Sequence, residues 1–330
     1  MGPLPFNMWI IEYLAGHRTP GFTRVFQFAS AMGEVQGYVL IGTLIYVMFD
    51  KRLAIRLVLL VALTAILNHV LKIIIKNPRP FVRQGDYLEK WAVPPSHAQV
   101  LVTDYSTPSG HAMAGSSFYG FLYGCERNRY VRILAVLAIL LTGLSRPYLG
   151  VHYVEDILLG WAIGLGMCVA GLKYADPITM FWDRRPYTQQ IGIAVAASLA
   201  LWLATIGING WQLDGQPRAF MGYAGTFTGI IVARPLELKI VDFDPKSSPL
   251  IFKVLRYLLS VGLAILALET LGRTFSAIAG NISIQGSVLQ YIRYTIVAVV
   301  SVFLAPWIFT RIGWANTVQA SAETKSAFLT

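Results

Sequence analysis

The chain has 330 residues, of which 55% are hydrophobic and only 13% are charged, and its mean hydropathy is +0.56. Soluble globular domains carry about 25% charged residues, and disordered chains are poor in apolar residues, so both classes are excluded. The net charge of +10 would suggest a nucleic-acid partner for a soluble domain. In a membrane protein the placement of the cations matters more, and no nucleic-acid partner is expected.

Apolar segments recur along the chain at close to the length of roughly 20 residues that a helix needs to cross a bilayer. The nine candidate spans are residues 31–49, 56–75, 111–125, 131–146, 155–172, 189–208, 219–236, 252–271 and 291–310. Residues 219–236 contain Arg234-Pro235 near one end, so this segment is either a short or tilted span or one that does not cross. The sequence therefore predicts an all-α fold, a polytopic membrane helical bundle.

The distribution of Lys and Arg orients these spans. If the turn at 49–56 is cytoplasmic, 16 of the 27 Lys and Arg residues lie on the cytoplasmic side and 11 on the other. This excess favours the assignment. It places the N-terminus, the loop at 76–110 and the turn at 146–155 together on the non-cytoplasmic face.

Cations gather at the borders of these non-cytoplasmic connections. Lys72 and Lys76 lie one helical turn apart at the end of the second span, and Arg79 follows a proline that ends the helix, so all three are expected to point into one pocket. Arg146 ends another span and joins them. Guanidinium groups bind phosphate oxygens in pairs and an ammonium adds a point charge, so the pocket is predicted to bind phosphate.

A helix start is predicted at Ser109-Gly110-His111, because an apolar run follows directly. The exposed backbone N–H groups of a helix start favour an anion, and the glycine lets a phosphate approach the backbone. His111 falls in the first turn, where it is placed to donate a proton.

His152 and Asp156 are four residues apart, a spacing that brings two side chains to one face of a helix. A carboxylate that accepts a hydrogen bond from one ring nitrogen leaves the other nitrogen as an oriented lone pair. A neutral imidazole held in this way is a nucleophile toward phosphorus, so this chemistry needs no metal and no cofactor is expected.

Together these residues resemble the signature of the type 2 phosphatidic acid phosphatase superfamily, which includes glucose-6-phosphatase and the vanadium haloperoxidases. All three parts of the signature are present with their spacing intact: Lys72-x6-Arg79-Pro80, Pro108-Ser109-Gly110-His111 and Ser145-Arg146-x5-His152-x3-Asp156. The resemblance covers residues 72–156 and the helices around them.

The resemblance implies a role for each signature residue. His152 attacks phosphorus to form a phosphohistidine, Asp156 orients His152, and His111 protonates the leaving oxygen. The groups expected to bind the phosphoryl oxygens are Lys72, Arg79, Ser109, Gly110 and Arg146. Two further residues are candidates near the site. Asn68 lies one turn before Lys72 and either orients it or bridges to a neighbouring helix, and Glu34 is an acid in the first span.

The expected organisation is an N-terminal interfacial segment at 1–30, a catalytic membrane core at 31–188 and additional transmembrane helices at 189–330. This corresponds to a six-helix phosphatase core with about three extra C-terminal spans. No secretory signal is recognised at the N-terminus. Membrane lipids are expected neighbours, and the expected location is a membrane such as the bacterial inner membrane, with the site on the periplasmic or other non-cytoplasmic face.

The expected activity is hydrolysis of a lipid phosphate or lipid diphosphate, such as phosphatidate or a prenyl diphosphate. A sugar-phosphate phosphatase remains open, because nine spans with an external N-terminus and the Asn68-x3-Lys72 spacing resemble glucose-6-phosphatase. A phosphotransferase that passes the phosphohistidine to a hydroxyl acceptor is a third possibility. A transporter or binding protein that uses the cationic pocket as an anion site is a fourth.

Overall fold

The computed structural model describes residues 4–318 except residues 5, 209, 212–215 and 281–282. The ends of the predicted N-terminal and C-terminal segments, residues 1–3, 5 and 319–330, lie outside the described residues. The described part is helical, with one isolated bridge between Phe243 and Thr317. The predicted all-α class is therefore confirmed.

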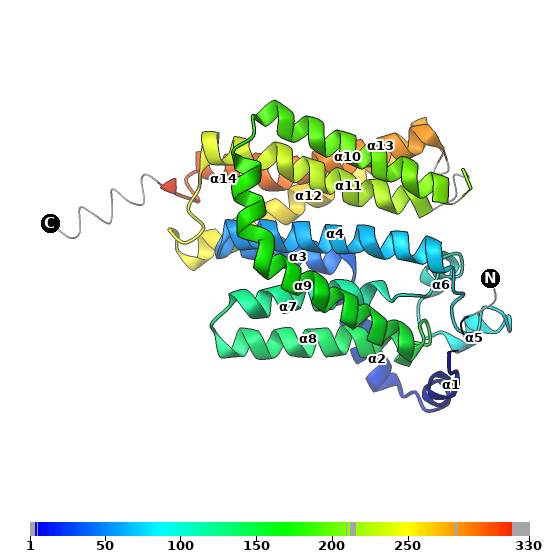
Figure 1. Ribbon diagram of the computed structural model, residues 1–330. Coiled ribbons are helices and arrows are strands. Elements are labelled where there is room, and N and C mark those ends of the chain that lie inside the picture. Colours follow the sequence, from blue (N-terminus) through cyan, green and yellow to red (C-terminus); the bar gives the residue numbers. More distant parts are fainter. Residues whose placement is uncertain (1–3, 5, 209, 212–215, 281–282, 319–330) are drawn as a thin grey trace. The chain divides into compact units, whose positions relative to one another are not determined.

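Helices follow one another along the chain with short connections, apart from the region before α7 (Figure 1). Their bounds are α1 Trp9–Gly16, α2 Pro20–Met32, α3 Val35–Met48, α4 Lys51–Ile75, α5 Tyr87–Lys90, α6 Pro95–Leu101, α7 Gly110–Cys125, α8 Arg129–Tyr148, α9 Val154–Asp183, α10 Tyr187–Ile208, α11 Gln216–Leu236, α12 Leu250–Ile278, α13 Ile284–Val299 and α14 Ala305–Arg311. Two short π-helices, η1 Glu237–Val241 and η2 Val300–Leu304, extend α11 and α13.

Six described helical segments are long and apolar enough to cross a membrane, and one of them is the continuous segment Ile284–Arg311, which comprises α13, η2 and α14. A seventh candidate is the α2–α3 pair, which is bent by 63°. Eight of the nine predicted spans lie within helical segments, while the predicted span 31–49 crosses the bend between α2 and α3. Two of the nine do not meet these requirements. The helix at 111–125 is α7, which has only 16 residues. The helix at 219–236 belongs to α11, whose hydropathy is lowered by Arg234 and Pro235 as well as by glycines and threonines.

The chain divides into two compact units. The first unit comprises Met1–Tyr38 and Leu63–Pro177, and it contains every signature residue. The second unit comprises Val39–Ala62 and Ile178–Thr330. Helices α4 and α9 contribute residues to both units.

The first unit is built on α7 and α8, which lie side by side and antiparallel (Figure 1). Side chains cap the start of both helices: Ser109 Oγ accepts from the Ala112 N–H, and Asn128 Oδ1 accepts from the Tyr130 N–H. Helix α2 packs along α8. A glycine lets α9 approach α7 closely, because a Cβ at Gly164 would overlap the Ser116 hydroxyl and the Met113 carbonyl.

A cluster of apolar side chains packs the N-terminal segment against the connections of this unit. Ile11 of α1 is fully buried there together with Phe81, Trp91, Leu149 and Val151. Burying such side chains contributes about 1.5–3 kcal/mol each. The connections at 76–109 and 149–153 therefore share one apolar core.

Arg18 joins the same connections through its guanidinium group. Its Nε donates to the carbonyl of Tyr148 at 2.8 Å, and its Nη1 donates to the carbonyl of Lys90 at 2.6 Å. Gly150 turns in the left-handed region with φ of +84°, and a Cβ there would lie 2.8 Å from Arg18 Nη2. Glycine is therefore required at this turn both for its conformation and for space.

The second unit contains α10 to α14 and packs α11 tightly against α13 (Figure 1). A Cβ at Gly225 would overlap the Tyr291 carbonyl, so glycine permits the close contact. The π-helix η2 leaves a carbonyl to be satisfied by a side chain, and the Tyr46 hydroxyl donates to Val302 O at 2.9 Å. Lys51 pairs with buried Glu237 at 2.9 Å.

Candidate active site

The signature residues come from the ends of four helices in the first unit. Lys72 lies in the last turn of α4 and Arg146 in the last turn of α8. His111 lies in the first turn of α7, and Asp156 in the first turn of α9. The connection at 76–109 supplies Arg79 and Ser109, and the connection at 149–153 supplies His152.

His152 is held at both ring nitrogens and is only 1% exposed. Its Nδ1 lies 3.1 Å from Asp156 Oδ2, and its Nε2 lies 2.8 Å from Arg79 Nη1. A guanidinium group can only donate, so Nε2 carries the lone pair and Nδ1 carries the hydrogen that Asp156 accepts. The spacing predicted this contact, although His152 precedes α9 and reaches Asp156 from the turn before the helix.

Asp156 is fully buried and receives hydrogen bonds from several donors. The Ser106 hydroxyl and the Thr107 hydroxyl each donate to it, and the Tyr153 N–H donates to its Oδ2 at 3.0 Å. Ser106 and Thr107 were missed in the sequence. Their only signal is their position directly before the Pro-Ser-Gly-His segment, which does not show that they reach back to α9.

The guanidinium group of Arg79 connects the loop at 76–109 to the loop at 149–153. Besides His152, its Nη1 donates to the Val151 carbonyl at 2.9 Å, and its Nε donates to the Asp104 carbonyl at 3.1 Å. Two non-glycine residues near it, Lys76 and Phe81, have φ values of +53° and +65°. Such conformations are costly for side-chain-bearing residues and are maintained by surrounding structure.

Asp104 is an acid inside the cation cluster, and it lies outside the signature segments. Its Oδ2 accepts from Lys72 Nζ and from Arg79 Nη2, the latter at 2.6 Å. Burial alone would raise the pKa of Asp104, but the two cations outweigh burial and hold it well below its usual range. Lys76, which was expected to join the pocket, is instead exposed.

Ser109 and Gly110 are placed against α4 and α9 by backbone and side-chain contacts. The Ser109 N–H donates to the Asp156 carbonyl at 3.1 Å. Asn68 donates from Nδ2 to the Pro108 carbonyl at 3.0 Å, and its Oδ1 would lie 3.1 Å from a Cβ at Gly110. Asn68 therefore bridges α4 to the start of α7.

The last two signature residues of the site are His111 and Arg146. Arg146 is 3% exposed and donates from Nη1 to the Ser30 hydroxyl. Its Nε and the Nε2 of His111 are buried without a hydrogen-bond partner among the described residues. Glu34 lies at the break between α2 and α3 and acts electrostatically on Arg146.

The charges that act on the two histidines indicate that His111 and His152 lie near the same three cations, Lys72, Arg79 and Arg146. The electrostatic neighbours of His111 include Arg146, His152, Arg79 and Lys72. Burial, followed by the charges of Arg79, Arg146 and Lys72, holds the pKa of His152 well below its usual value. Within the described residues, no three His, Cys, Asp or Glu side chains are grouped as metal ligands.

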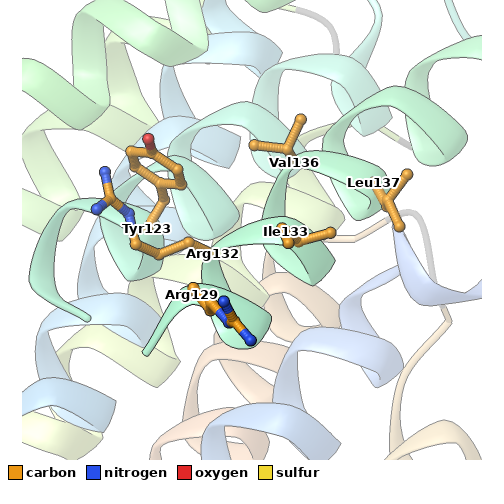
Figure 2. A pocket seen from close by; sticks show the side chains of 6 residues that line it. All are labelled: Tyr123, Arg129, Arg132, Ile133, Val136 and Leu137. Carbon is orange, nitrogen blue, oxygen red and sulfur yellow. The ribbon is translucent and has the colours of Figure 1, made fainter. Parts of the chain in front are cut away.

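A separate hollow lies at the other end of the α7–α8 pair (Figure 2). It is lined by Tyr123, Arg129, Arg132, Ile133, Val136 and Leu137, and none of these is a signature residue. The Arg132 guanidinium lies 4.0 Å from the centre of the Tyr123 ring. Helix α7 has 16 residues and so separates its two ends by about 24 Å, which makes this hollow distinct from the site.

Several curated relatives match the part of the chain that carries the site. Sphingosine-1-phosphate phosphatase 2 of Mus musculus is 34% identical over 142 residues, covering 41% of this chain and 38% of that protein. Undecaprenyl-diphosphatase of Sulfolobus acidocaldarius is 25% identical over 160 residues, covering 48% of this chain and 73% of that protein. Phosphatidylglycerophosphatase B of Bacillus subtilis is 33% identical over 90 residues, covering 24% and 44%. The chain spans less than half the length of the sphingosine-1-phosphate phosphatases that it matches.

A solved structure also matches the chain. It is the first transmembrane PAP2 type phosphatidylglycerolphosphate phosphatase from Bacillus subtilis, at 25% sequence identity and a TM-score of 0.42. The match covers 52% of this chain and 84% of that chain.

Two family models match successive parts of the chain. Residues 53–180 match the model described as PAP2 superfamily, and this range contains the three signature segments. Residues 221–317 match the model described as PAP2 superfamily phosphatase, transmembrane extension. The chain is therefore a multi-span integral membrane protein that belongs to the PAP2 superfamily.

Proposed function

We propose that the chain is a membrane phosphohydrolase that releases phosphate from a phosphorylated lipid through a phosphohistidine. The observation that carries this proposal is the state of His152. Its Nδ1 is bonded to Asp156, and its Nε2 lone pair faces the cationic group of Arg79. A neutral, oriented imidazole beside cations is suited to attack phosphorus.

In the first step, Arg79 turns its Nη1 from His152 Nε2 to the phosphate, and the freed Nε2 lone pair forms a bond to phosphorus while the bond from phosphorus to the leaving oxygen breaks. His111 gives its proton to that oxygen. The negative charge that Asp156 places beside Nδ1 stabilises the ring as it becomes positive. In the second step, water attacks phosphorus, the nitrogen–phosphorus bond breaks, and His111 takes a proton from the water.

The phosphoryl oxygens are bound by positively charged side chains and by the start of α7. Lys72, Arg79 and Arg146 supply three positive charges, and the start of α7 at Gly110 supplies backbone donors at a helix N-terminus. Asn68 and Glu34 support this arrangement through Pro108 and Arg146. The proposed reaction needs no metal, since these side chains supply the positive charge that a metal would otherwise provide.

The proposed substrate class is a phosphomonoester or diphosphate of a membrane lipid. The names of three relatives support it, because they refer to sphingosine 1-phosphate, undecaprenyl diphosphate and phosphatidylglycerophosphate. We place the site on the non-cytoplasmic face, a periplasmic face if the membrane is bacterial, because Lys and Arg are in excess in the loops of the opposite side. We assign catalysis to residues 31–188.

The test is phosphate release by the purified protein in nanodiscs. The substrates are phosphatidate, sphingosine 1-phosphate, a prenyl diphosphate, phosphatidylglycerophosphate and glucose 6-phosphate. We expect release from at least one lipid, and its loss in His152→Ala. His97→Ala is the matched control, because His97 is exposed on α6 of the same connection.

Each outcome separates the proposal from an alternative. Release from glucose 6-phosphate alone would favour a sugar phosphatase. Release that appears only when a hydroxyl acceptor is added, with transfer to that acceptor, would favour a phosphotransferase. Lipid turnover that survives in His152→Ala would contradict the proposed nucleophile.

A further inference from the structure

Asp104 occupies the position in which the cations would bind a phosphoryl oxygen. One oxygen atom of its carboxylate, Oδ2, accepts from both Lys72 Nζ and Arg79 Nη2. Lys72 and Arg79 are two of the three cations proposed to bind phosphate. A carboxylate oxygen held between an ammonium and a guanidinium group is the same kind of contact that a phosphate oxygen would make.

The charges of the site favour an exchange between this carboxylate and phosphate. Lys72, Arg79 and Arg146 carry three positive charges, while Asp104, Asp156 and Glu34, which acts on Arg146, carry three negative charges. The Asp104 carboxylate balances part of the charge of the two cations that it contacts. If this carboxylate turns away, one negative charge leaves Lys72 and Arg79, and a phosphate dianion is favoured in its place.

The position of Asp104 allows its side chain to move while its backbone stays in place. Its side chain is 21% exposed, whereas those of Lys72 and Arg79 are 8% and 2% exposed, so the carboxylate is on the solvent side of the cations. Its carbonyl is held by Arg79 Nε at 3.1 Å. Two residues later, the Ser106 N–H donates to the Asn77 carbonyl at 2.8 Å. Rotation about the side-chain bonds alone would release the cations.

We propose that Asp104 is a resident anion that occupies the phosphate subsite of the free protein and exchanges with the phosphate group of the substrate. This inference rests on the proposed function, because it assigns the occupant of the same site before substrate binds and after product leaves. Asp104 competes with every phosphate that enters. It therefore weakens the binding of inorganic phosphate, and its return promotes release of that product.

The test is direct binding of inorganic phosphate and orthovanadate to the full-length protein in nanodiscs, measured by calorimetry without turnover. Asp104→Asn keeps the shape of the side chain and removes its charge. We expect both anions to bind about ten- to a hundredfold more tightly to this variant, the effect of one charged hydrogen-bonding competitor. Glu89→Gln is the matched control, because Glu89 is an exposed carboxylate in α5 of the same connection.

Weaker or unchanged binding in Asp104→Asn would overturn the proposal and indicate that Asp104 positions the cations for phosphate. Failure of both proteins to bind either anion would also overturn it. Wild-type protein provides a second measurement if the variant does not fold. Carbodiimide-driven amine labelling of Asp104, mapped by mass spectrometry, should become faster when orthovanadate saturates the site. Labelling that is unchanged or slower would contradict the exchange.

The two proposals fail in different ways. Tighter anion binding by Asp104→Asn, in a protein that releases phosphate from none of the substrates, would support the exchange and contradict the hydrolase. Lipid turnover by a protein whose Asp104→Asn variant binds phosphate no more tightly would support the hydrolase and contradict the exchange.

Discussion

The two histidines of the site differ in how completely their surroundings are bonded. His152 and Asp156 form a closed hydrogen-bonded group, with Arg79 on one ring nitrogen and the hydroxyls of Ser106 and Thr107 on the carboxylate. On the other side, His111 Nε2 and Arg146 Nε are buried without hydrogen-bond partners among the described residues. A buried polar atom without a partner costs about 1–3 kcal/mol. The surroundings of His152 are thus fully hydrogen-bonded, whereas those of His111 keep buried polar atoms that the proposed substrate would bond.

Disrupting the hydrogen bonds between Asp156 and its partners should cause the largest loss of activity. Asp156→Asn keeps the shape of the side chain but replaces one acceptor oxygen by an NH2 group, which faces donors that need an acceptor. The hydrogen of His152 is then no longer held on Nδ1. We expect kcat to fall by about three to four orders of magnitude. Phosphate release in nanodiscs measures this loss, and Glu155→Gln is the control because it changes the neighbouring carboxylate. A decrease of less than tenfold would show that Asp156 does not set the state of His152.

The loss of kcat on removal of His111 should depend on the leaving group of the substrate. In His111→Ala we expect kcat for an alkyl phosphate to fall by about 10²- to 10⁴-fold, because the leaving oxygen has lost its proton donor. An aryl phosphate such as p-nitrophenyl phosphate leaves without a proton and should be affected much less. His152→Ala should abolish hydrolysis of both. Equal losses on both substrates in His111→Ala would assign His111 a role other than proton donor.

The pH dependence should show the influence of the cations on His152. Its pKa is lowered, so activity on p-nitrophenyl phosphate should be retained below the usual histidine pKa of about 6.5 and decline only at lower pH, where His152 becomes protonated. Arg146→Gln removes a positive charge and raises this pKa, so the acid limb of kcat/KM should move to higher pH. Arg129→Gln, at the other end of α8, should leave the limb in place. An acid limb that does not move in Arg146→Gln would contradict the assignment.

Removal of divalent metal ions by a chelator should have the smallest effect on activity. Because cationic side chains surround the phosphate position on both sides of the site, we expect EDTA to leave the rate of phosphate release unchanged. Orthovanadate, a mimic of the five-coordinate transition state, should inhibit in the same assay. A loss of activity in EDTA that a divalent metal restores would show that a metal takes part.

The sequence predicted most of the residues that meet at the site, because the spacing of the signature fixes their types and order. The contact between His152 and Asp156 follows from their separation of four residues. The bridge from Asn68 to the start of α7 was one of the two interpretations considered for that residue. The roles of these side chains in catalysis stay predictions until the variants are measured.

The site residues that the sequence did not predict lie in the long connection between α4 and α7. Asp104, Ser106 and Thr107 reach the site because the loop folds back, and the spacing of polar residues in a loop carries no periodic signal of that path. Two of the nine predicted spans fall short of the length or hydropathy of the other six or seven candidates. Apolar composition alone does not show that α7 is short or that glycines in α11 serve packing against α13.

Arg18 has a consequence for how the protein tolerates change at its N-terminal segment. Its guanidinium group holds the carbonyls of Tyr148 and Lys90, and it lies against the turn at Gly150, two residues before the nucleophile. Deletions or insertions that displace Arg18 would therefore alter the position of His152 without touching any signature residue.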